Sequence, residues 1–447
     1  MPSTYLTLTP SGSGNQRKFT FSVWIKPAAK APASSYFLFG TGTSSNYTHL
    51  YLDSNQNLVM KGRASSSTFC NVITNRVFKD AAAFYHICVA VDTEQGTAAD
   101  RVKMYVNGVQ ETSFATATYP SQNDDFENQN ASAPFKIGTN YANDANETFE
   151  GTMAYFAYCD GQQLAPTVFG STDSTSGQWK INTNPSFTPG TNGFLILKDG
   201  NSLTDQTANT NNFALAAGSL LDSKDNPSNS FCNINYLINQ TGGQGVTVTD
   251  AGTRTEYSTD SSRSVFGNFA LNQGKFYWEV KLANATSVVV GIANVGEWSN
   301  LNEASGYAYH DHALNVGINS SGNVDSGGSA ASYGNSLTTN DIVGIALDLD
   351  NRKLYFAKNG TWQNSGDPTS GSTGTGAASF TFSTNAMALY APAGRLRNGT
   401  DLHWNFGAGF FRTTAVASEG TNASGNGKFE YDVPTGYTAL STKGLNK

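Results

Sequence analysis

Four glutamates in the second half of the chain are the candidates for glycosidic-bond chemistry. Hydrolysis of that bond needs two carboxyl groups that reach the scissile bond from both sides. Glu256, Glu279, Glu297 and Glu303 instead stand singly, without a Glu-x-Asp-x-x-Glu alternation along one strand. Glu279 also faces away from the apolar side of its predicted strand. A glycan-processing enzyme is therefore the least favoured function.

Two other groupings have the residue types of a catalytic or metal site. Residues 325–328, Asp-Ser-Gly-Gly, are similar to the nucleophile loop of serine proteases, but no matching His motif supplies the rest of a triad. His310 and His312 would share one side of a strand, yet two ligands do not make a metal site unless a symmetric trimer joins three copies. The alternative for residues 325–328 is a Gly/Ser-rich loop that matches by coincidence, and the alternative for the two histidines is a solvated loop or strand end. We therefore predict no enzyme activity.

An oxygen-rich loop precedes the predicted strand that begins at Phe149. It contains the carboxylates of Asp144 and Glu147 and the carbonyl groups of residues 140–143. Hard oxygen ligands of this kind suit Ca²⁺. A plain polar loop is the alternative, and no other cofactor is expected.

Four aromatic residues of the second half lie in or beside predicted loops and are the candidates for ligand binding. Exposed rings at such positions stack on sugars or anchor a protein contact. The alternative is that they pack the loops onto the core, which is the expected role of Trp278 within its strand. The four candidates are Trp298, Tyr307, Tyr309 and Trp362.

The elements that must position these residues are strands. In residues 348–360, Leu354 and Phe356 face one side and Lys353 and Tyr355 the other, the alternation of a half-buried strand. An Asn-Gly dipeptide follows and tolerates the positive φ angles of a two-residue turn. A similar hairpin in the first half of the chain predicts two β-sandwiches, one in each half.

Composition also indicates an all-β protein with two domains. The chain has 447 residues, too many for one ordinary core. Charged residues make up only 14%, aromatic residues 12%, and Ser, Thr and Asn are abundant. This mixture suits short strands joined by polar turns.

Charge and hydropathy argue against several classes of partner. The net charge is −7 and there is no run of Lys or Arg, so no nucleic-acid partner is expected. No 18 apolar residues run together and no secretory signal is visible, so no membrane insertion is expected. The four cysteines show no CxxC spacing, and we expect reduced, buried thiols.

The strand pattern predicts two antiparallel sandwiches or jelly rolls. We place the first domain at residues 1–160, a polar connector packed on both domains at 161–245, and the second domain at 246–447. The clearest strands of the first domain lie at residues 5–10, 19–27, 36–40, 49–52, 84–92, 102–108 and 149–158. Those of the second lie at residues 254–257, 274–282, 288–293, 341–349 and 353–358.

Both halves resemble known domain families. Residues 5–10, 21–26, 84–87 and 101–109 resemble the laminin-G-like, concanavalin-type domains of marine tailed-phage virion proteins. The second half is similar to a SPRY domain, on the motifs at residues 277–280, 290–293, 348–360 and 405–407. The connector and residues 434–440 also resemble those phage proteins. The resemblance implies a concanavalin-like sandwich followed by a SPRY sandwich, and Ca²⁺ at a rim loop of the first.

The same resemblance implies a function. It favours a non-enzymatic structural protein of the phage virion, a tail-fibre or tail-tip subunit that contributes to adhesion to host-surface glycan. A capsid decoration or head-fibre protein is the alternative. Expected partners are other virion proteins and a host-surface glycan or protein, and we expect a homo-oligomer, with a trimer favoured. The expected location is the exterior of the virion, after assembly in the host cytoplasm. Because the first domain begins almost at Met1, we expect docking through a domain surface, the connector or the C-terminal tail.

Overall fold

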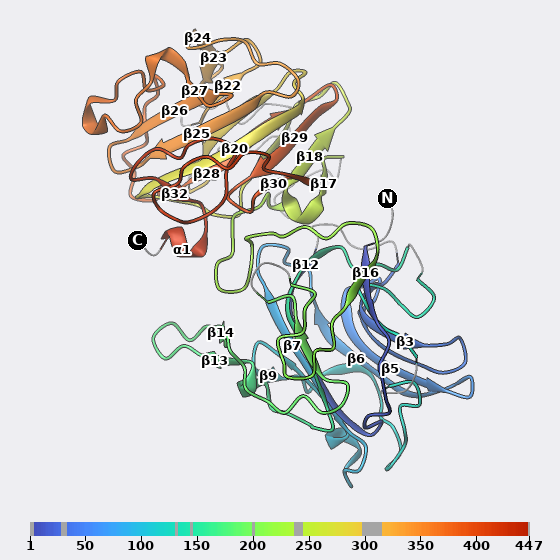
Figure 1. The fold of residues 1–447 in the computed structure, drawn as a ribbon. Coiled ribbons are helices and arrows are strands. Elements are labelled where there is room, and N and C mark those ends of the chain that lie inside the picture. Colours follow the sequence, from blue (N-terminus) through green and yellow to red (C-terminus); the bar gives the residue numbers. More distant parts are fainter. Residues whose placement is uncertain are drawn as a thin grey trace. The chain divides into compact units, whose positions relative to one another are not determined.

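The computed structural model contains two compact units, both built from antiparallel sheets (Figure 1). The residues it describes are 4–27, 34–129, 133–143, 146–198, 202–236, 245–296 and 315–445. Unit 1 comprises Met1–Asp222 and Asn226–Ser228; unit 2 comprises Ser223–Asp225 and Asn229–Lys447. The predicted all-β fold class is confirmed.

Unit 1 is a sandwich of two large sheets with a small hairpin beside them. The eight-stranded sheet consists, in spatial order, of β10 (Phe114–Thr118), β6 (Ser67–Val77), β5 (Asn57–Ala64), β4 (Tyr47–Leu52), β3 (Tyr36–Gly42), β11 (Phe135–Ile137), β1 (Tyr5–Leu8) and β16 (Ala214–Ala217). The six-stranded sheet consists of β15 (Phe194–Ile196), β12 (Gly151–Asp160), β2 (Lys18–Pro27), β7 (Tyr85–Asp92), β8 (Val102–Val106) and β9 (Val109–Gln110). β13 (Gly170–Thr172) and β14 (Trp179–Ile181) form the hairpin.

The core of unit 1 follows from the alternation in β2. Its apolar residues Phe19, Phe21, Val23 and Ile25 are completely buried within one hydrophobic cluster. The Phe21 ring lies 5.1 Å from that of Tyr158 on the neighbouring β12. Burial of each such side chain contributes about 2 kcal/mol.

The opposite face of β2 is also buried, because the segment after β12 folds over it. Trp24 is only 4% exposed and stacks on His86 at 4.9 Å. The ring of Trp179, in β14, also stacks on the His86 imidazole, at 5.8 Å, and its Nε1–H donates to His86 Nδ1 at 3.0 Å. A Cβ on Gly108 would meet the Trp179 ring at 2.3 Å, so the turn after β8 needs glycine there.

Most of the predicted connector, residues 161–245, lies within unit 1. β15 pairs with β12 and β16 pairs with β1, so this segment adds a strand to each large sheet. The boundary between the units falls near Asp222. The polar composition of the segment comes from the loops that join these short strands, which concealed their sheet pairing.

Unit 2 is a second sandwich. One sheet consists of β17 (Thr247–Thr249), β18 (Arg254–Tyr257), β29 (Thr400–Asn405), β20 (Lys275–Asn284), β25 (Ile342–Asp348), β26 (Lys353–Lys358) and β27 (Thr361–Trp362), with β32 (Thr438–Ala439) paired to β20. The other consists of β19 (Arg263–Phe266), β28 (Tyr390–Leu396), β21 (Val289–Asn294), β22 (Val316–Asn319), β23 (Asn323–Ser326) and β24 (Ser329–Ser332). β30 (Phe410–Phe411) pairs with β31 (Thr414–Ala415), and α1 spans Thr442–Leu445.

The sheet that contains β20 is buried on both faces. Trp278 and Val280 face the sandwich core, as predicted, and are fully buried. Tyr277 and Tyr355 on the other face are also at most 1% exposed. The expectation that the β26 hairpin is half-buried is therefore wrong at Tyr355. Later parts of the chain cover this face; the ring of Phe429, for example, lies 5.1 Å from that of Tyr277.

The two ends of unit 2 are joined by backbone hydrogen bonds. Cys232 N donates to Leu440 O at 2.9 Å, and Thr442 N donates to Ser230 O at 2.9 Å. The parallel pairing of β32 with β20 follows directly from this closure.

Two smaller expectations concern thiols and membrane spans. All four cysteines are buried and have free thiols, as expected. Within the described part of the chain, no helix has the length and apolar character needed to cross a membrane.

Candidate functional site

Only one of the four predicted ligand-binding aromatics falls on described residues. Trp362 lies in the edge strand β27, where its ring is 6.3 Å from that of Tyr277 and 6.5 Å from that of Tyr355. It therefore packs the edge of the sheet and is not part of a free loop. Outside the described residues lie Trp298, Tyr307 and Tyr309, together with Glu297, Glu303, His310 and His312.

The predicted Ca²⁺ loop is closed by its own hydrogen bonds. Glu147 is half-buried; its Oε1 accepts from Ser34 Oγ at 3.3 Å, and its Oε2 accepts from Asn140 Nδ2. Asp144 lies outside the described residues. Among the residues that the structure does describe, no three His, Cys, Asp or Glu side chains are grouped as a metal site would require.

Glu279 is a buried structural carboxylate. It accepts from the backbone N–H groups of Glu430 and Tyr431, each at 2.9 Å, and from Tyr277 Oη at 3.0 Å. Burial raises its pKa to about 7, although the hydrogen bonds oppose that rise. This carboxylate fixes the C-terminal segment across the sheet and is enclosed away from any substrate.

The other sequence candidates also have structural surroundings. Glu256 forms an ion pair with Arg254 at 2.7 Å on the sheet surface. Residues 325–328 form the turn between β23 and β24, with Gly327 and Gly328 at φ angles of 61° and 71°. That conformation is the one a two-residue hairpin requires, so local backbone geometry explains the Gly-Gly pair.

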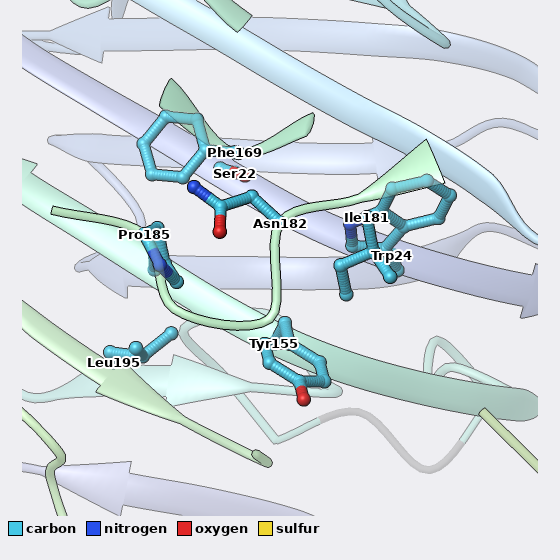
Figure 2. A pocket seen from close by; sticks show the side chains of 9 residues that line it. Ser22, Trp24, Tyr155, Phe169, Ile181, Asn182, Pro185 and Leu195 are labelled. Carbon is cyan, nitrogen blue, oxygen red and sulfur yellow. The ribbon is translucent and has the colours of Figure 1, made fainter. Parts of the chain in front are cut away.

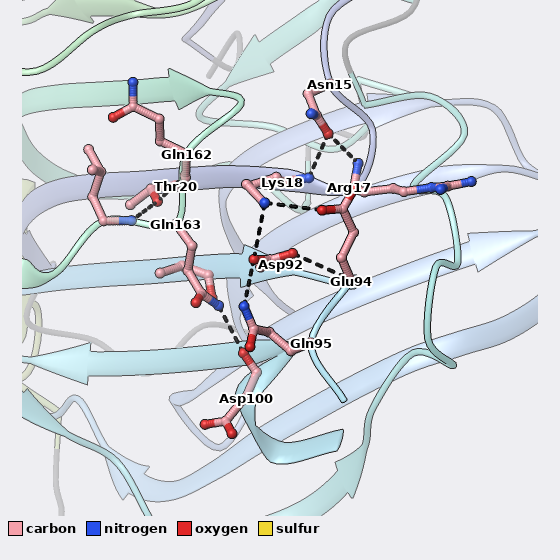
Figure 3. Close-up of polar contacts among 12 residues, drawn as sticks. Asn15, Arg17, Lys18, Thr20, Asp92, Glu94, Gln95, Asp100, Gln162 and Gln163 are labelled. Atoms are coloured by element: carbon pink, nitrogen blue, oxygen red, sulfur yellow. Dashed lines mark hydrogen bonds and ion pairs between the residues drawn. The ribbon is translucent and has the colours of Figure 1, made fainter. Parts of the chain in front are cut away.

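A group of acids in unit 1 surrounds a lysine (Figure 3). Lys18 Nζ lies 3.4 Å from Asp92 Oδ2 and 3.1 Å from Glu94 Oε2. Close by, Gln163 donates to the Asp100 carbonyl at 2.8 Å, which fixes the chain after β12. The two carboxylates are thus held by a cation where the central strands β2 and β7 of the six-stranded sheet begin and end.

One pocket of unit 1 is too small for a ligand. It lies between the six-stranded sheet and the loop after β14, with Trp24 and Tyr155 on one side and Asn182 and Pro185 on the other (Figure 2). Its volume is about 10 Å³, which is close to the minimum for a single water molecule.

A larger pocket lies at one end of unit 2, and we call it the loop-end pocket. Its volume is about 240 Å³. The residues that line it come from the turn after β25, the chain before β20 and the loop before β28: Asn272, Leu349, Arg352, Phe382, Ser383, Thr384, Asn385, Ala386, Ala388 and Tyr390. Leu349, Phe382, Ala388 and Tyr390 are buried, and Asn272, Arg352, Thr384 and Asn385 are exposed. The pocket therefore combines an apolar wall with an open polar rim.

Local contacts hold the loop-end pocket in shape. The rings of Phe382 and Tyr390 meet edge to face at 5.1 Å, and Ser383 N donates to Tyr390 Oη at 2.7 Å. Leu271 and Tyr390 exchange two backbone hydrogen bonds at 2.7 and 2.8 Å. Val295 N, just after β21, donates to Leu389 O at 2.7 Å. A rigid apolar wall beneath amide, hydroxyl and guanidinium groups can orient a polar ligand.

Sequence reasoning missed the loop-end pocket. The only signal for it was a Ser/Thr/Asn-rich loop between two aromatic residues, Phe382 and Tyr390. Its third side, the turn at Arg352, comes from a hairpin that was recognised only as scaffold. The strand order of unit 2 brings these segments together.

Comparison with known proteins agrees with these folds. Residues 2–168 match the family model of the concanavalin A-like lectin/glucanases superfamily, and residues 275–407 match that of the SPRY domain. No curated protein matches the chain significantly.

Solved structures that match the chain do so at low identity. The SPRY domain of human HERC1 is 16% identical; the match covers 36% of this chain and 92% of that chain, with a TM-score of 0.27. A heptameric SAP-like pentraxin from Limulus polyphemus is 17% identical; the match covers 36% of this chain and 71% of that chain, with a TM-score of 0.27. Stonustoxin is 14% identical; the match covers 39% of this chain and 27% of that chain, with a TM-score of 0.28. The likeness is too low to support a functional argument. The family matches show that this chain contains a concanavalin-like N-terminal domain and a C-terminal SPRY domain.

Proposed function

We propose that the chain is a non-enzymatic structural protein on the exterior of a tailed-phage virion. In this proposal it is a tail-fibre or tail-tip subunit that contributes to adhesion to host-surface glycan. The phage assignment rests on the sequence motifs of both halves. The observation that supports adhesion is the loop-end pocket of the SPRY domain, which is open, polar at its rim and about 240 Å³ in volume.

The lining of the pocket suits hydroxyl-rich ligands. Asn272 and Asn385 offer both amide donors and acceptors, and Arg352 adds five N–H donors. The buried rings beneath them supply an apolar surface for the C–H groups of a sugar. Removal of a charged hydrogen-bonding partner costs about 1.5–3 kcal/mol, so loss of the Arg352 guanidinium should weaken binding roughly tenfold or more.

A binding experiment tests the adhesion proposal. The full-length chain is screened against immobilised host-surface glycans, with Arg352→Ala as the pocket variant. Arg397→Ala is the matched control, because Arg397 is also a partly exposed arginine of unit 2 but pairs with Asp260 at 2.7 Å away from the pocket. A tenfold loss for Arg352→Ala with an unchanged control supports the proposal. Absence of any glycan binding, or equal binding by both variants, contradicts it.

Labelling of particles tests the position in the virion. We expect a gold label on the C-terminus to appear at the tail tip. Label spread over the capsid would favour the decoration or head-fibre alternative. Sedimentation of the purified chain tests the proposed trimer, and a monodisperse monomer at high concentration would contradict it.

A further inference from the structure

The outward face of the eight-stranded sheet in unit 1 carries a row of aromatic side chains. Inward residues of β4 such as Leu50 are fully buried in the core. Because side chains alternate along a strand, Tyr47, His49 and Tyr51 share the opposite, outward face. The register places Arg63 opposite Tyr47 and Lys61 opposite His49 on the neighbouring β5.

A glycine on the next strand leaves room for a loop that carries a further ring. Gly40 of β3 is the partner of His49. A Cβ there would meet the carbonyl oxygen of Thr139 at 2.8 Å, so the chain after β11 lies directly on the sheet. This loop brings in Tyr141, and Lys136 donates to the Tyr141 carbonyl.

The rings form two stacks. The Tyr47, His49 and Tyr141 rings are within 10–13° of parallel, and their centroids are 4.1, 5.5 and 5.7 Å apart. Tyr51 stacks on Phe37 at 4.6 Å and 14°. His49 and Phe37 are each 5% exposed and form the base, whereas the three tyrosines are half-buried and reach solvent.

The imidazole in this base is neutral and has an unused nitrogen. Burial, and secondarily the charge of Lys61, lower the pKa of His49 to about 3. Its Nε2 has no hydrogen-bond partner among the described residues. The positive charge of this face therefore comes from other side chains.

Three cations surround the rings, and we call Tyr47, Tyr51, Tyr141, Lys61, Arg63 and Lys136 together the tyrosine face. The Arg63 guanidinium lies 5.9 Å from the centre of the Tyr47 ring and donates to Ser44 O at 3.2 Å. No ion pair to Lys61, Arg63 or Lys136 is present among the described residues. The acids that reach this area, Asp53 and Glu147, act on Tyr51.

We propose that the tyrosine face is a binding site for an acidic saccharide, a sugar chain that carries carboxylate or sulfate groups. Sugar rings present C–H patches that pack on tyrosine faces, and the anionic substituents match lysine and arginine side chains that form no ion pair with a described carboxylate. The cores of protein interfaces are depleted of lysine, whereas two of the three cations of this face are lysines, Lys61 and Lys136. The inference rests on the proposed adhesion function and names a second surface and a ligand class for it.

The test uses the full-length chain and a short oligogalacturonate, with its methyl ester as the neutral control. Esterification removes the charge and keeps the ring, so we expect the ester to bind at least tenfold more weakly. Lys61→Gln should weaken acid binding about fivefold or more and Lys61→Arg should not. Tyr141→Ala should weaken it and Tyr141→Phe should retain it. Circular dichroism and the unfolding temperature check that each variant is folded.

Other outcomes overturn the inference without ambiguity. Equal binding of acid and ester, or wild-type affinity in Lys61→Gln, removes the charge argument. Displacement of the saccharide by polyglutamate at similar concentration, with no effect of Tyr141→Ala, would assign the face to acidic proteins. The Arg352→Ala variant distinguishes the two proposals, because it should leave oligogalacturonate binding unchanged. A chain that binds neutral glycans through Arg352 but no oligogalacturonate would refute this inference alone; a chain that binds no glycan at all would refute the proposed function.

Discussion

Glu279 allows a direct test of how burial controls a carboxyl group in the SPRY domain. The side chain is completely buried and accepts hydrogen bonds from two backbone N–H groups and from Tyr277 Oη. Replacement by Gln keeps the shape and one acceptor oxygen but removes the titration. Because each carboxylate oxygen accepts a backbone N–H, Gln also loses a hydrogen bond at every pH, and the pH-dependent part of the difference reports the free energy of ionising Glu279.

The expected pH effect follows from the raised pKa. In the folded chain the pKa of Glu279 is about 7 instead of the ordinary 4.5. Between these values the folded state binds more protons than the unfolded state, so the stability of the domain falls as pH rises. The stabilisation is complete below about pH 4.5 and lost above about pH 7. A difference of 2.5 units corresponds to about 3 kcal/mol.

Urea unfolding of wild type and Glu279→Gln between pH 4.5 and 8 measures this effect. The fluorescence of the fully buried Trp278 and Trp404 reports the transition of unit 2. We expect the wild type to lose about 3 kcal/mol relative to the variant over this range. Glu256→Gln, at a side chain that is 42% exposed, is the control and should show little pH-dependent change. A wild type that gains stability with pH, or a constant difference, would refute the reasoning.

Three further predictions concern other contacts. Gly360→Ala should cost about 2–4 kcal/mol in urea unfolding, because φ is +78° and the new Cβ would lie 2.5 Å from a tyrosine ring. The control Gly371→Ala, where φ is +60° and the new Cβ would meet open space, should cost only about 1 kcal/mol. Equal costs for the two variants would contradict this reasoning. Burial raises the pKa of the Asp401 carboxyl, but the His403 imidazole 3.4 Å away and the Arg254 guanidinium, which donates at 2.8 Å, lower it to about 2. Asp401→Asn should therefore lose about 2 kcal/mol of stability at pH 6 and none near pH 2, and a pH-independent loss would argue against the pairing. Trp179→Phe should lose the bond to His86 Nδ1 and destabilise unit 1 by about 1 kcal/mol in thermal unfolding; an unchanged transition would show that this bond contributes nothing.

The alternation of apolar and polar residues along single strands could be predicted from the sequence because it is a local property. The apolar face of β2 and that of β20 were predicted correctly, as was the Asn-Gly turn after β26, where Asn359 and Gly360 have φ angles of 48° and 78°. The segments that cover the opposite faces of these strands cannot be identified from the residues of the strands themselves. Tyr355 is covered by the chain that follows β26, where its ring lies 6.5 Å from that of Trp362 and its Oη lies 3.3 Å from Ser370 Oγ, and no alternation pattern within the strand contains that information.

The two proposed binding surfaces also depend on information that is not local in the sequence. The strand that carries Tyr47 and Tyr51 was recognised only from His49 onward, and nothing in its own residues indicates that Lys61 lies opposite. Tyr141 arrives by a loop that fits because Gly40 has no side chain. Register and loop path thus create the tyrosine face. The loop-end pocket likewise depends on strand order, whereas Trp362, a candidate chosen by residue type, lies in the edge strand β27 with its ring 6.3 Å from that of Tyr277.

The closure of unit 2 by its own two ends constrains how the domain is made in the cell. Residues 438–442 complete the sheet by pairing with β20 and with residues 230–232. At roughly 5–20 residues per second, a ribosome needs on the order of 10 s or more to synthesise the intervening chain. During that time the outer face of β20, with Tyr277 and Glu279, lacks its cover. We therefore expect this domain to complete its fold only after residues 438–442 have left the ribosome.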